Sequence, residues 1–374
     1  MYLTGKFRYR LSILFILFTF LMIGCSGGEA QNEAQRTTAA SEASGNAEEV
    51  GEANEDEEHE EHDSEDVVLA LPELTAVELN GERLKVVAST SIIGDVVSHI
   101  GGEMIELTTL IGPGQDSHSY EPSPQDIRAA TDADVIFVNG WDLEESLAHD
   151  LEEMGEEGVA VVPISAGIEL LVVGEAEHEE HDDEHTEAED DHQHSGADPH
   201  VWFSIQNVEQ WVENVTAVFS ALDPANAETY EGNAAEYTAE LTELASYVES
   251  QIAQLPEDNR LLVTNHDSFG YFARDYHFEV VGTVIPAAST LAEPSARDLA
   301  DLIETMNANG LCTIFSETSI GDSLAQTVAA ELDGCETVRV LPLYTESIGQ
   351  AGSGADSYID MYQANVDAIV EGLK

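Results

Sequence analysis

Three apolar runs set the fold class: LKVVAS at residues 84–89, IELTTLI at 105–111 and DVIFVN at 134–139. Each run is short and rich in residues that favour strands, and helix-like sequence lies between and after them. Strands that alternate with helices are typical of βαβ units, which form a largely parallel sheet. These residues therefore predict an α/β lobe.

A second group of strands lies nearer the C-terminus, after long helical sequence. Helices are expected at 206–222 and, after Asp223-Pro224, at about 227–255. Apolar residues recur in the second helix at three- and four-residue spacing, namely at Tyr230, Ala234, Tyr237, Leu241, Leu244, Tyr247, Val248 and Ile252. At 1.5 Å per residue such a helix is about 40 Å long and can run along the whole molecule. The later strands are predicted at RLLVT (260–264), EVVGT (279–283), LCTIF (311–315) and VRVL (338–341).

The chain is expected to divide into two α/β lobes, each with a mainly parallel β-sheet flanked by helices. The roughly 300 residues that follow the expected signal peptide and tether are too many for one ordinary hydrophobic core. We expect an N-terminal lobe at 84–203, linking helices at 204–257 and a C-terminal lobe at 258–374.

Export and anchoring signals precede the lobes. Three basic residues come before an apolar run at 11–23, which is shorter than the roughly 20 residues of a spanning helix, so residues 1–24 predict a signal peptide. The sequence MIGC resembles a bacterial lipobox, which implies that the thiol of Cys25 is lipidated; a plain signal peptide is the alternative. This places the protein on the outer face of the cytoplasmic membrane, anchored by lipid.

Residues 25–83 are expected to be an acidic, disordered tether, because they begin with a long stretch almost free of large apolar residues. His59 and His62 within it are either a weak metal-collecting patch or merely solvated tether.

The chain is strongly acidic, with 12 Lys+Arg against 75 Asp+Glu and a net charge of −63. Such a field repels nucleic acid, which excludes DNA or RNA as an expected partner. Residues 26–66 hold 15 of the acids and residues 175–198 hold 12, which leaves 48 acids against 8 basic residues elsewhere. We interpret this charge as adaptation to a saline habitat, where salt screens self-repulsion.

An acidic loop expected at 175–197 carries five histidines: His178, His181, His185, His192 and His194. Imidazole and carboxylate together suit zinc and its neighbours, whereas calcium or magnesium is bound by oxygen alone. The tract predicts an auxiliary metal-collecting loop; a loop that serves only solubility is the alternative.

Four residues are candidate ligands at a fixed site. His118, His266 and Glu346 each follow the carboxyl end of a predicted strand, which is where ligands bind in open α/β sheets. His200 stands at the end of the acidic loop, where helical sequence begins. Singly each histidine is more often structural, but together they indicate a site shared by the two lobes.

These residues lie in motifs that resemble the metal-binding solute-binding proteins of zinc and manganese ABC importers. The motifs are GPGQDSHSYEPSPQD, ADPHVWF, NHDSFGYFARDY, IFSETSI, PLYTESIG and GADSYIDMYQANVDAIVEGL, in the family's order. The resemblance implies two lobes joined by a long rigid helix, metal in the interlobe cleft, and ligand roles for His118, His200, His266 and Glu346. It also implies an ABC permease as partner, and we expect a monomer.

The resemblance favours Zn²⁺ over Mn²⁺. Zinc members have histidine at the third ligand position, here His266, and His-rich loops like the tract. The fourth ligand is usually Asp, so Glu346 departs from the pattern and its coordination is left open. Glu317 is expected at most to support a ligand. Alternatives are a manganese receptor, a surface adhesin or a zinc hydrolase, but no H-E-x-x-H helix supports an enzyme.

Two further groups of residues have structural interpretations. Cys312 and Cys335 are an even pair that adjacent parallel strands would bring together, either as a disulfide or as two buried thiols. Aromatic residues flank two of the candidate ligands and are expected to pack in the core rather than bind a ligand, namely Trp202, Phe203, Phe269, Tyr271 and Phe272.

Overall fold

The computed structural model describes residues 68–172 and 196–374. The predicted signal peptide, Cys25, most of the expected tether with His59 and His62, and the five histidines of the acidic loop lie outside the described residues. Within 68–172 and 196–374, no helix is both long enough and apolar enough to cross a membrane.

The first lobe has a four-stranded parallel sheet in the order β2-β1-β3-β4. Its strands are β1 (Leu84–Thr90), β2 (Ile105–Ile111), β3 (Val135–Val138) and β4 (Ala160–Pro163). Its helices are α1 (Ser91–Gly101), α2 (Pro124–Thr131) and α3 (Ala148–Glu156). Alternate residues of β1 face opposite sides: Val86 packs with α1, and Val87 packs in a separate cluster with α2 and α3. This lobe has the predicted strands, plus β4, which the sequence analysis missed.

The second lobe repeats the plan, with strand order β6-β5-β7-β8 and all neighbours parallel. Its strands are β5 (Leu261–Thr264), β6 (Glu279–Thr283), β7 (Thr313–Glu317) and β8 (Arg339–Leu343). Its helices are α6 (Gly270–Tyr276), α7 (Ala296–Asn309), α8 (Ser323–Glu331) and α9 (Tyr358–Leu373). Strand β7 begins and ends two residues later than predicted, because its pairing with β8 continues to Glu317 opposite Leu343.

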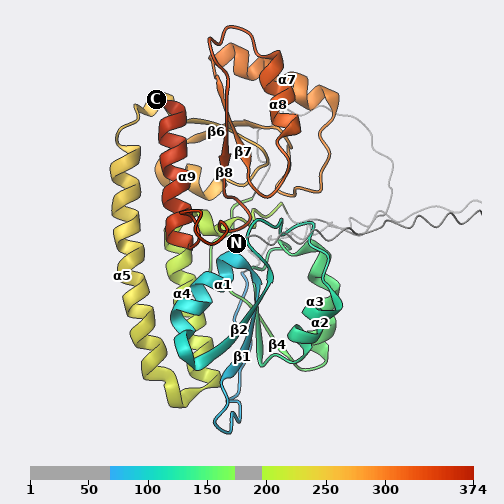
Figure 1. Cartoon of the computed structure of the whole chain (residues 1–374), viewed down its shortest axis with the longest axis vertical. Coiled ribbons are helices and arrows are strands. Elements are labelled where there is room, and N and C mark those ends of the chain that lie inside the picture. The colour runs from blue at the N-terminus through green and yellow to red at the C-terminus, as the bar shows by residue number, and fades with distance from the viewer. Residues whose placement is uncertain (1–67, 173–195) are drawn as a thin grey trace, which may run out of the picture. The chain divides into compact units, whose positions relative to one another are not determined.

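Two long helices, α4 (Ile205–Leu222) and α5 (Ala227–Ile252), pack against each other beside the sheets (Figure 1). Helix α5 has 26 residues and contacts both α1 of the first lobe and α9 of the second. Seven of the eight predicted apolar-face residues are buried. The exception, Tyr247, is half-buried and donates a hydrogen bond to Asp367 of α9, 2.6 Å away.

Part of the segment expected to be tether is packed on the first lobe. Gly167 N donates to Leu69 O at 2.9 Å, and Val77 N donates to Leu222 O at 2.8 Å. Leu71, Leu74 and Val77 also pack against the main apolar core. The prediction of disorder is therefore wrong for residues 69–79, since their leucine and valine side chains bury apolar surface that the acidic sequence before them lacks.

Other structural predictions concern the cysteines, the aromatic residues and the surface. Cys312 and Cys335 form a disulfide in the structure. The five aromatic residues beside the candidate ligands are all buried, as expected for core packing.

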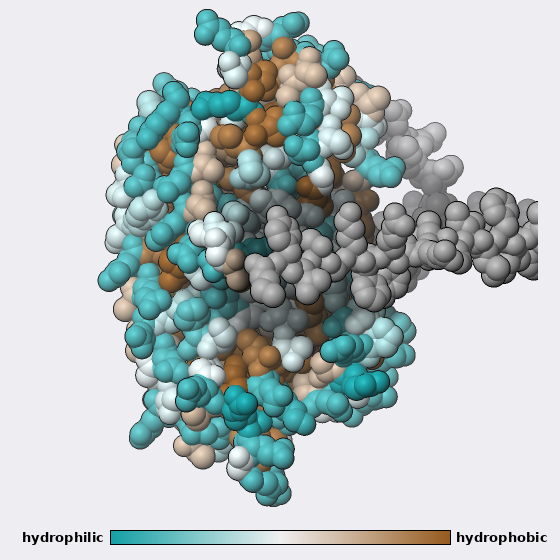
Figure 2. Space-filling view, in the orientation of Figure 1, coloured by the Kyte–Doolittle hydropathy of each residue, from teal (hydrophilic) through white to brown (hydrophobic). Residues whose placement is uncertain are grey.

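Hydrophilic side chains cover most of the face of the described residues seen in Figure 2.

Candidate metal centre

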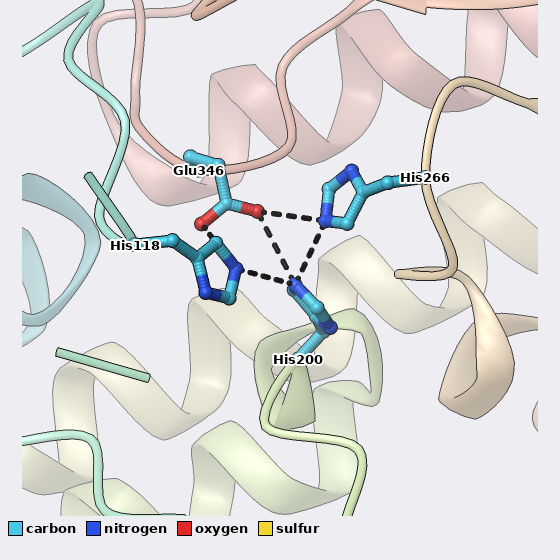
Figure 3. Close-up of side chains that lie close together, drawn as sticks. All are labelled: His118, His200, His266 and Glu346. Carbon is cyan, nitrogen blue, oxygen red and sulfur yellow. Dashed lines mark hydrogen bonds and ion pairs between the residues drawn. The ribbon is translucent and has the colours of Figure 1, made fainter. Parts of the chain in front are cut away.

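The four predicted ligands come together although they lie on four separate segments. His118 is in the loop after β2, His266 follows β5, Glu346 follows β8, and His200 directly precedes the short 3-10 helix Val201–Phe203. One possible ligand atom from each residue lies within 4.8 Å of those of the others (Figure 3). All four residues are at most 1 % exposed. Loops at the carboxyl ends of both parallel sheets therefore converge on one buried point.

The imidazole Nε2 atoms face one another and the carboxylate. His200 Nε2 is 3.0 Å from His266 Nε2 and 3.4 Å from His118 Nε2. Glu346 Oε1 is 3.3 Å from His200 Nε2 and 3.4 Å from His266 Nε2, while its Oε2 is 3.7 Å from His118 Nε2. A tetrahedral ion with bonds near 2.0–2.1 Å holds its ligand atoms about 3.3–3.4 Å apart. These spacings fit a single ion in the centre.

Each histidine has a carboxylate at its other ring nitrogen. The Nδ1 atom of His118 is 3.0 Å from Glu145 Oε1, and that of His200 is 2.8 Å from Asp198 Oδ1. His266 Nδ1 pairs in the same way with Glu317 Oε1. A carboxylate that accepts the Nδ1 proton leaves the Nε2 lone pair free for a metal and fixes the ring orientation.

Sequence reasoning identified only one of these three supporting carboxylates. Glu317 was expected to support a ligand, and it does so from the end of β7, where Thr345 Oγ1 donates to its Oε2 at 2.6 Å. Asp198 was missed, although it lies two residues before His200, a spacing that is a usable signal. Glu145 has no such signal, because it lies 27 residues from His118 in the chain.

The charges of the buried histidines and carboxylates shift one another's pKa values. Burial alone would lower the pKa of His200, but hydrogen bonds to Asp198 and Glu346 and their charges raise it to about 9. The pKa of His266 is likewise raised well above its ordinary value, against burial, by the charge and hydrogen bond of Glu317 and by Glu346. Burial would raise the pKa of Glu346, yet the three imidazoles hold it well below its usual range. Without metal, the cluster therefore keeps protons on histidine next to an ionised carboxylate.

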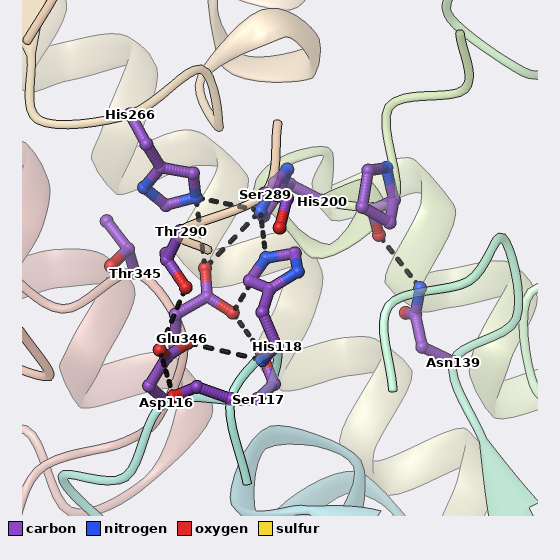
Figure 4. A network of polar contacts seen from close by, with 12 residues as sticks. Asp116, Ser117, His118, Asn139, His200, His266, Ser289, Thr290, Thr345 and Glu346 are labelled. Carbon is purple, nitrogen blue, oxygen red and sulfur yellow. Dashed lines mark hydrogen bonds and ion pairs between the residues drawn. The ribbon is translucent and has the colours of Figure 1, made fainter. Parts of the chain in front are cut away.

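Glu346 is held by the first lobe and still has an unused acceptor. Ser117, next to His118, donates its hydroxyl to Glu346 Oε2 (Figure 4). Within the described residues, Oε1 receives no hydrogen bond of ordinary geometry. A buried anionic oxygen in this state needs a cation beside it. Protonated His200 and His266 supply that charge in the metal-free protein, and a bound metal would supply it in their place.

Two hydrogen bonds join the loops of the two lobes beside the centre, and a third lies within the first lobe. Thr290 Oγ1 of the second lobe donates to Asp116 Oδ2 at 2.8 Å (Figure 4). Trp202 Nε1 donates to Thr345 O at 3.0 Å, beside Glu346. Asn139 Nδ2 donates to Pro199 O at 2.8 Å, just before His200. The backbone on each side of the centre is thus held by hydrogen bonds.

Backbone contacts with residues 171 and 172 hold the residues just before His200. Val172 and Ala197 form an isolated antiparallel bridge, and Asp198 N donates to Leu171 O at 2.8 Å. His200 N in turn donates to Asp198 Oδ1 at 3.0 Å. The position of His200 is thereby set from Leu171 on one side and from Val201 on the other.

The chain resembles known metal-binding proteins over most of its length. The profile of the family described as "Zinc-uptake complex component A periplasmic" (ZnuA) matches residues 86–372. The manganese-binding lipoprotein MntA of Halalkalibacterium halodurans is 34 % identical over 301 residues, covering 80 % of this chain and 92 % of the relative. The manganese ABC transporter substrate-binding lipoprotein PsaA of Streptococcus pneumoniae is 31 % identical over 303 residues, covering 79 % and 90 %.

A solved structure has the same fold. The periplasmic zinc-binding protein TroA of Treponema pallidum superposes with a TM-score of 0.68 at 29 % identity, covering 78 % of this chain and 99 % of that one. The family model is described as a zinc-uptake component, and PsaA is named as the substrate-binding lipoprotein of a manganese ABC transporter. The chain is thus of the substrate-binding class and not an enzyme, as expected. The chain belongs to the ZnuA family, the metal-binding solute-binding proteins of ABC importers.

Proposed function

We propose that the protein is an extracytoplasmic receptor that binds one divalent transition metal and delivers it to the permease of an ABC importer. The ligands are His118, His200, His266 and Glu346. The observation that carries the proposal is the closed set of three imidazoles, each backed by a carboxylate, around one buried acid. Backing of this kind is typical of histidines that bind metal.

We infer zinc as the cargo from the donor set. Three imidazole nitrogens and one carboxylate are typical of tetrahedral zinc, and the spacings of the ligand atoms suit such a centre. The five histidines at 178–194 and their acidic neighbours add donors of the same kind in the sequence.

Manganese is the second candidate, and two observations favour it. Relatives that share about a third of the residues are named as manganese-binding. Both oxygens of Glu346 face the imidazoles, Oε1 toward His200 and Oε2 toward His118. A carboxylate that binds through both oxygens raises the coordination number above the four that is usual for zinc, and oxygen ligands suit manganese.

Calorimetry with Zn²⁺ and with Mn²⁺, each alone and then in competition, tests both parts of the proposal. We expect tight binding of one ion per protein, with Zn²⁺ displacing Mn²⁺, and a large loss of affinity in His200→Ala. His149→Ala is the matched control, because that imidazole is 81 % exposed on α3. Wild-type affinity in His200→Ala would refute the site. Displacement of zinc by equimolar manganese would refute the zinc assignment and leave the site standing.

The N-terminal sequence supports a lipid anchor at Cys25, consistent with relatives that are named lipoproteins. Mass spectrometry of the wild-type protein should show a lipid on Cys25, and Cys25→Ala should lack that mass, with metal affinity unchanged. An unmodified Cys25 in the wild-type protein would contradict lipidation at this residue.

The histidine tract acts, in this proposal, as an auxiliary collector and not as part of the tight site. Deleting residues 175–194 should leave the affinity of the tight site unchanged and remove only the weaker additional metal ions per chain. Metal analysis after equilibrium dialysis measures both numbers. A deletion variant that loses tight binding would place the tract in the site itself.

A further inference from the structure

The three histidine–carboxylate pairs differ in their exposure to solvent. The side chains of Asp198 and Glu317 are each 2 % exposed, whereas that of Glu145 is 25 % exposed. Asp198 and Glu317 also accept the backbone N–H of the histidine they support, at 3.0 and 3.2 Å. The backbone N–H of His118 donates to Asp116 and not to Glu145. His118 is thus the ligand whose support lies nearest to water.

A cavity of about 500 Å³ lies against this exposed pair. Within the described part of the chain, His118 is the only one of the four ligands that lines this cavity. Glu145 also lines the cavity. The first lobe contributes Trp141 and Pro199 to the walls, and the second contributes Ala287, Ala288, Ser289, Leu291 and Ala292. Leu291 on that rim is 52 % exposed. The cavity therefore runs between the lobes to the imidazole of His118.

The size and lining of the cavity suit the passage of a hydrated cation. A water molecule occupies about 30 Å³, so an ion with six waters needs roughly 200 Å³, which the cavity exceeds. Ala287, Ala288 and Ala292 offer no side-chain ligands that would trap an ion on the way. Carboxylates of Asp142 and Glu145 on the lining attract a cation toward His118.

We propose that the metal enters and leaves through this cavity, and that Glu145 positions His118 as the ligand that completes and first opens the coordination sphere. The proposal rests on the function proposed above, since it assumes that the four residues bind a divalent ion. His200 and His266, each held twice by a buried carboxylate, stay in place while His118 exchanges the ion with the cavity.

Blocking the cavity tests the path. Ala288→Trp and Ala292→Trp, made separately in the full chain, should slow both association and dissociation of Zn²⁺ by one common factor of about tenfold or more, because a barrier in a path affects both directions equally. The equilibrium affinity then stays at the wild-type value. Stopped-flow mixing with a fluorescent zinc indicator gives association, and competition with excess chelator gives dissociation. Ala239→Trp on the exposed face of α5 is the matched control.

Glu145→Ala tests the role of the support. We expect faster dissociation of Zn²⁺ and a loss of affinity of about 10- to 100-fold. Glu145→Gln, which keeps an oxygen that accepts the Nδ1 proton, should recover part of the affinity. An unchanged dissociation rate in Glu145→Ala would overturn the positioning role.

The outcomes separate this proposal from the proposed function. If the wild-type protein binds no divalent ion tightly, the proposed function fails. If it binds Zn²⁺ and both tryptophan variants have wild-type rates, only the path fails. Two variants are used so that failure of one to fold leaves the other decisive.

Discussion

Gly270, the first residue of α6, is a residue on which the centre depends without contacting the ligands. A Cβ atom at this position would lie 2.5 Å from Asp198 Oδ2, the carboxylate that holds His200. Real Cβ atoms do not approach an oxygen that closely, and Asp198 is buried, so its carboxylate would have to move. Glycine at 270 is therefore explained by the supporting pair and not by the geometry of the helix.

Gly270→Ala should lower metal affinity by about tenfold or more, the usual effect of losing such a support. Gly232→Ala is the control, because no atom lies within 4 Å of a Cβ built there on α5. Calorimetry of the single variants and of Gly270→Ala combined with Asp198→Ala separates the causes. If alanine at 270 acts through Asp198, it has no further effect once that carboxylate is gone; additive losses would contradict this explanation.

The pH dependence of binding follows from the raised pKa of His200, about 9 in the metal-free protein. Imidazole binds metal only when neutral, so the ion must displace this proton. Affinity should rise with pH up to about 9, by roughly tenfold per unit for this proton alone. The stability of the metal-free fold depends on pH with the opposite sign. Protonated His200 stabilises this fold fully below about pH 6.5, and the stabilisation is lost as the pH rises through about 9. Chelator competition between pH 7 and 9 measures the first effect; a flat profile would contradict it.

From the ordinary pKa of histidine, near 6.5, metal binding would be expected to weaken only as the pH falls toward about 5. The structure moves it upward, because Asp198 and Glu346 surround His200 and outweigh burial. The ligands themselves were predictable, since residues after parallel strands meet at one sheet edge. Their supports were harder to find: with 75 acidic residues in the chain, an acid such as Glu145 stands out only once the fold sets its orientation.

At the scale of elements, the long helices were predicted closely and the short strands less well. Helix α5 begins at the predicted residue. It also has the predicted apolar face, of which seven positions are buried. Strand β4, AVVP, was missed because four residues that end in proline carry no periodicity; pairing with β3 makes it a strand. The limits of β7 likewise depend on its partner β8 and not on its own sequence.

A capping contact between elements of different lobes offers a test of their coupling. Asp95 on α1 accepts the backbone N–H of Tyr358, the first residue of α9, at 2.9 Å. Asp95→Ala should lower the free energy of unfolding by about 1–2 kcal/mol, the usual cost of a lost cap. Urea denaturation measures this, with exposed Asp132→Ala as control. Equal stabilities of the two variants would show that the contact contributes nothing.

At the scale of the whole molecule, the net charge of −63 dominates. The ion pairs of arginine do little to offset it: Arg274 pairs with the adjacent Asp275, and Arg297 with Asp301 one helical turn on, so neither pair joins two elements. Repulsion between unpaired carboxylates destabilises the folded state, and salt screens it over about 10 Å at 0.1 M and about 3 Å at 1 M.

The melting temperature should therefore rise by several degrees between dilute buffer and molar KCl. Differential scanning calorimetry of the metal-free protein measures the shift. The control is the same pair of salt concentrations near pH 4, where many carboxylates are protonated and the shift should shrink. A melting temperature that does not change with salt at pH 7 would end the interpretation as adaptation to salinity.

The bridge between Val172 and Ala197, together with the bond from Asp198 N to Leu171 O, has an evolutionary consequence. Because these contacts join the two ends of the segment between Val172 and Ala197, the number of residues in that segment does not alter the position of His200. Insertions, deletions and repeat expansions can accumulate there while the metal centre stays under selection. The same junction is a natural position at which to graft a reporter domain.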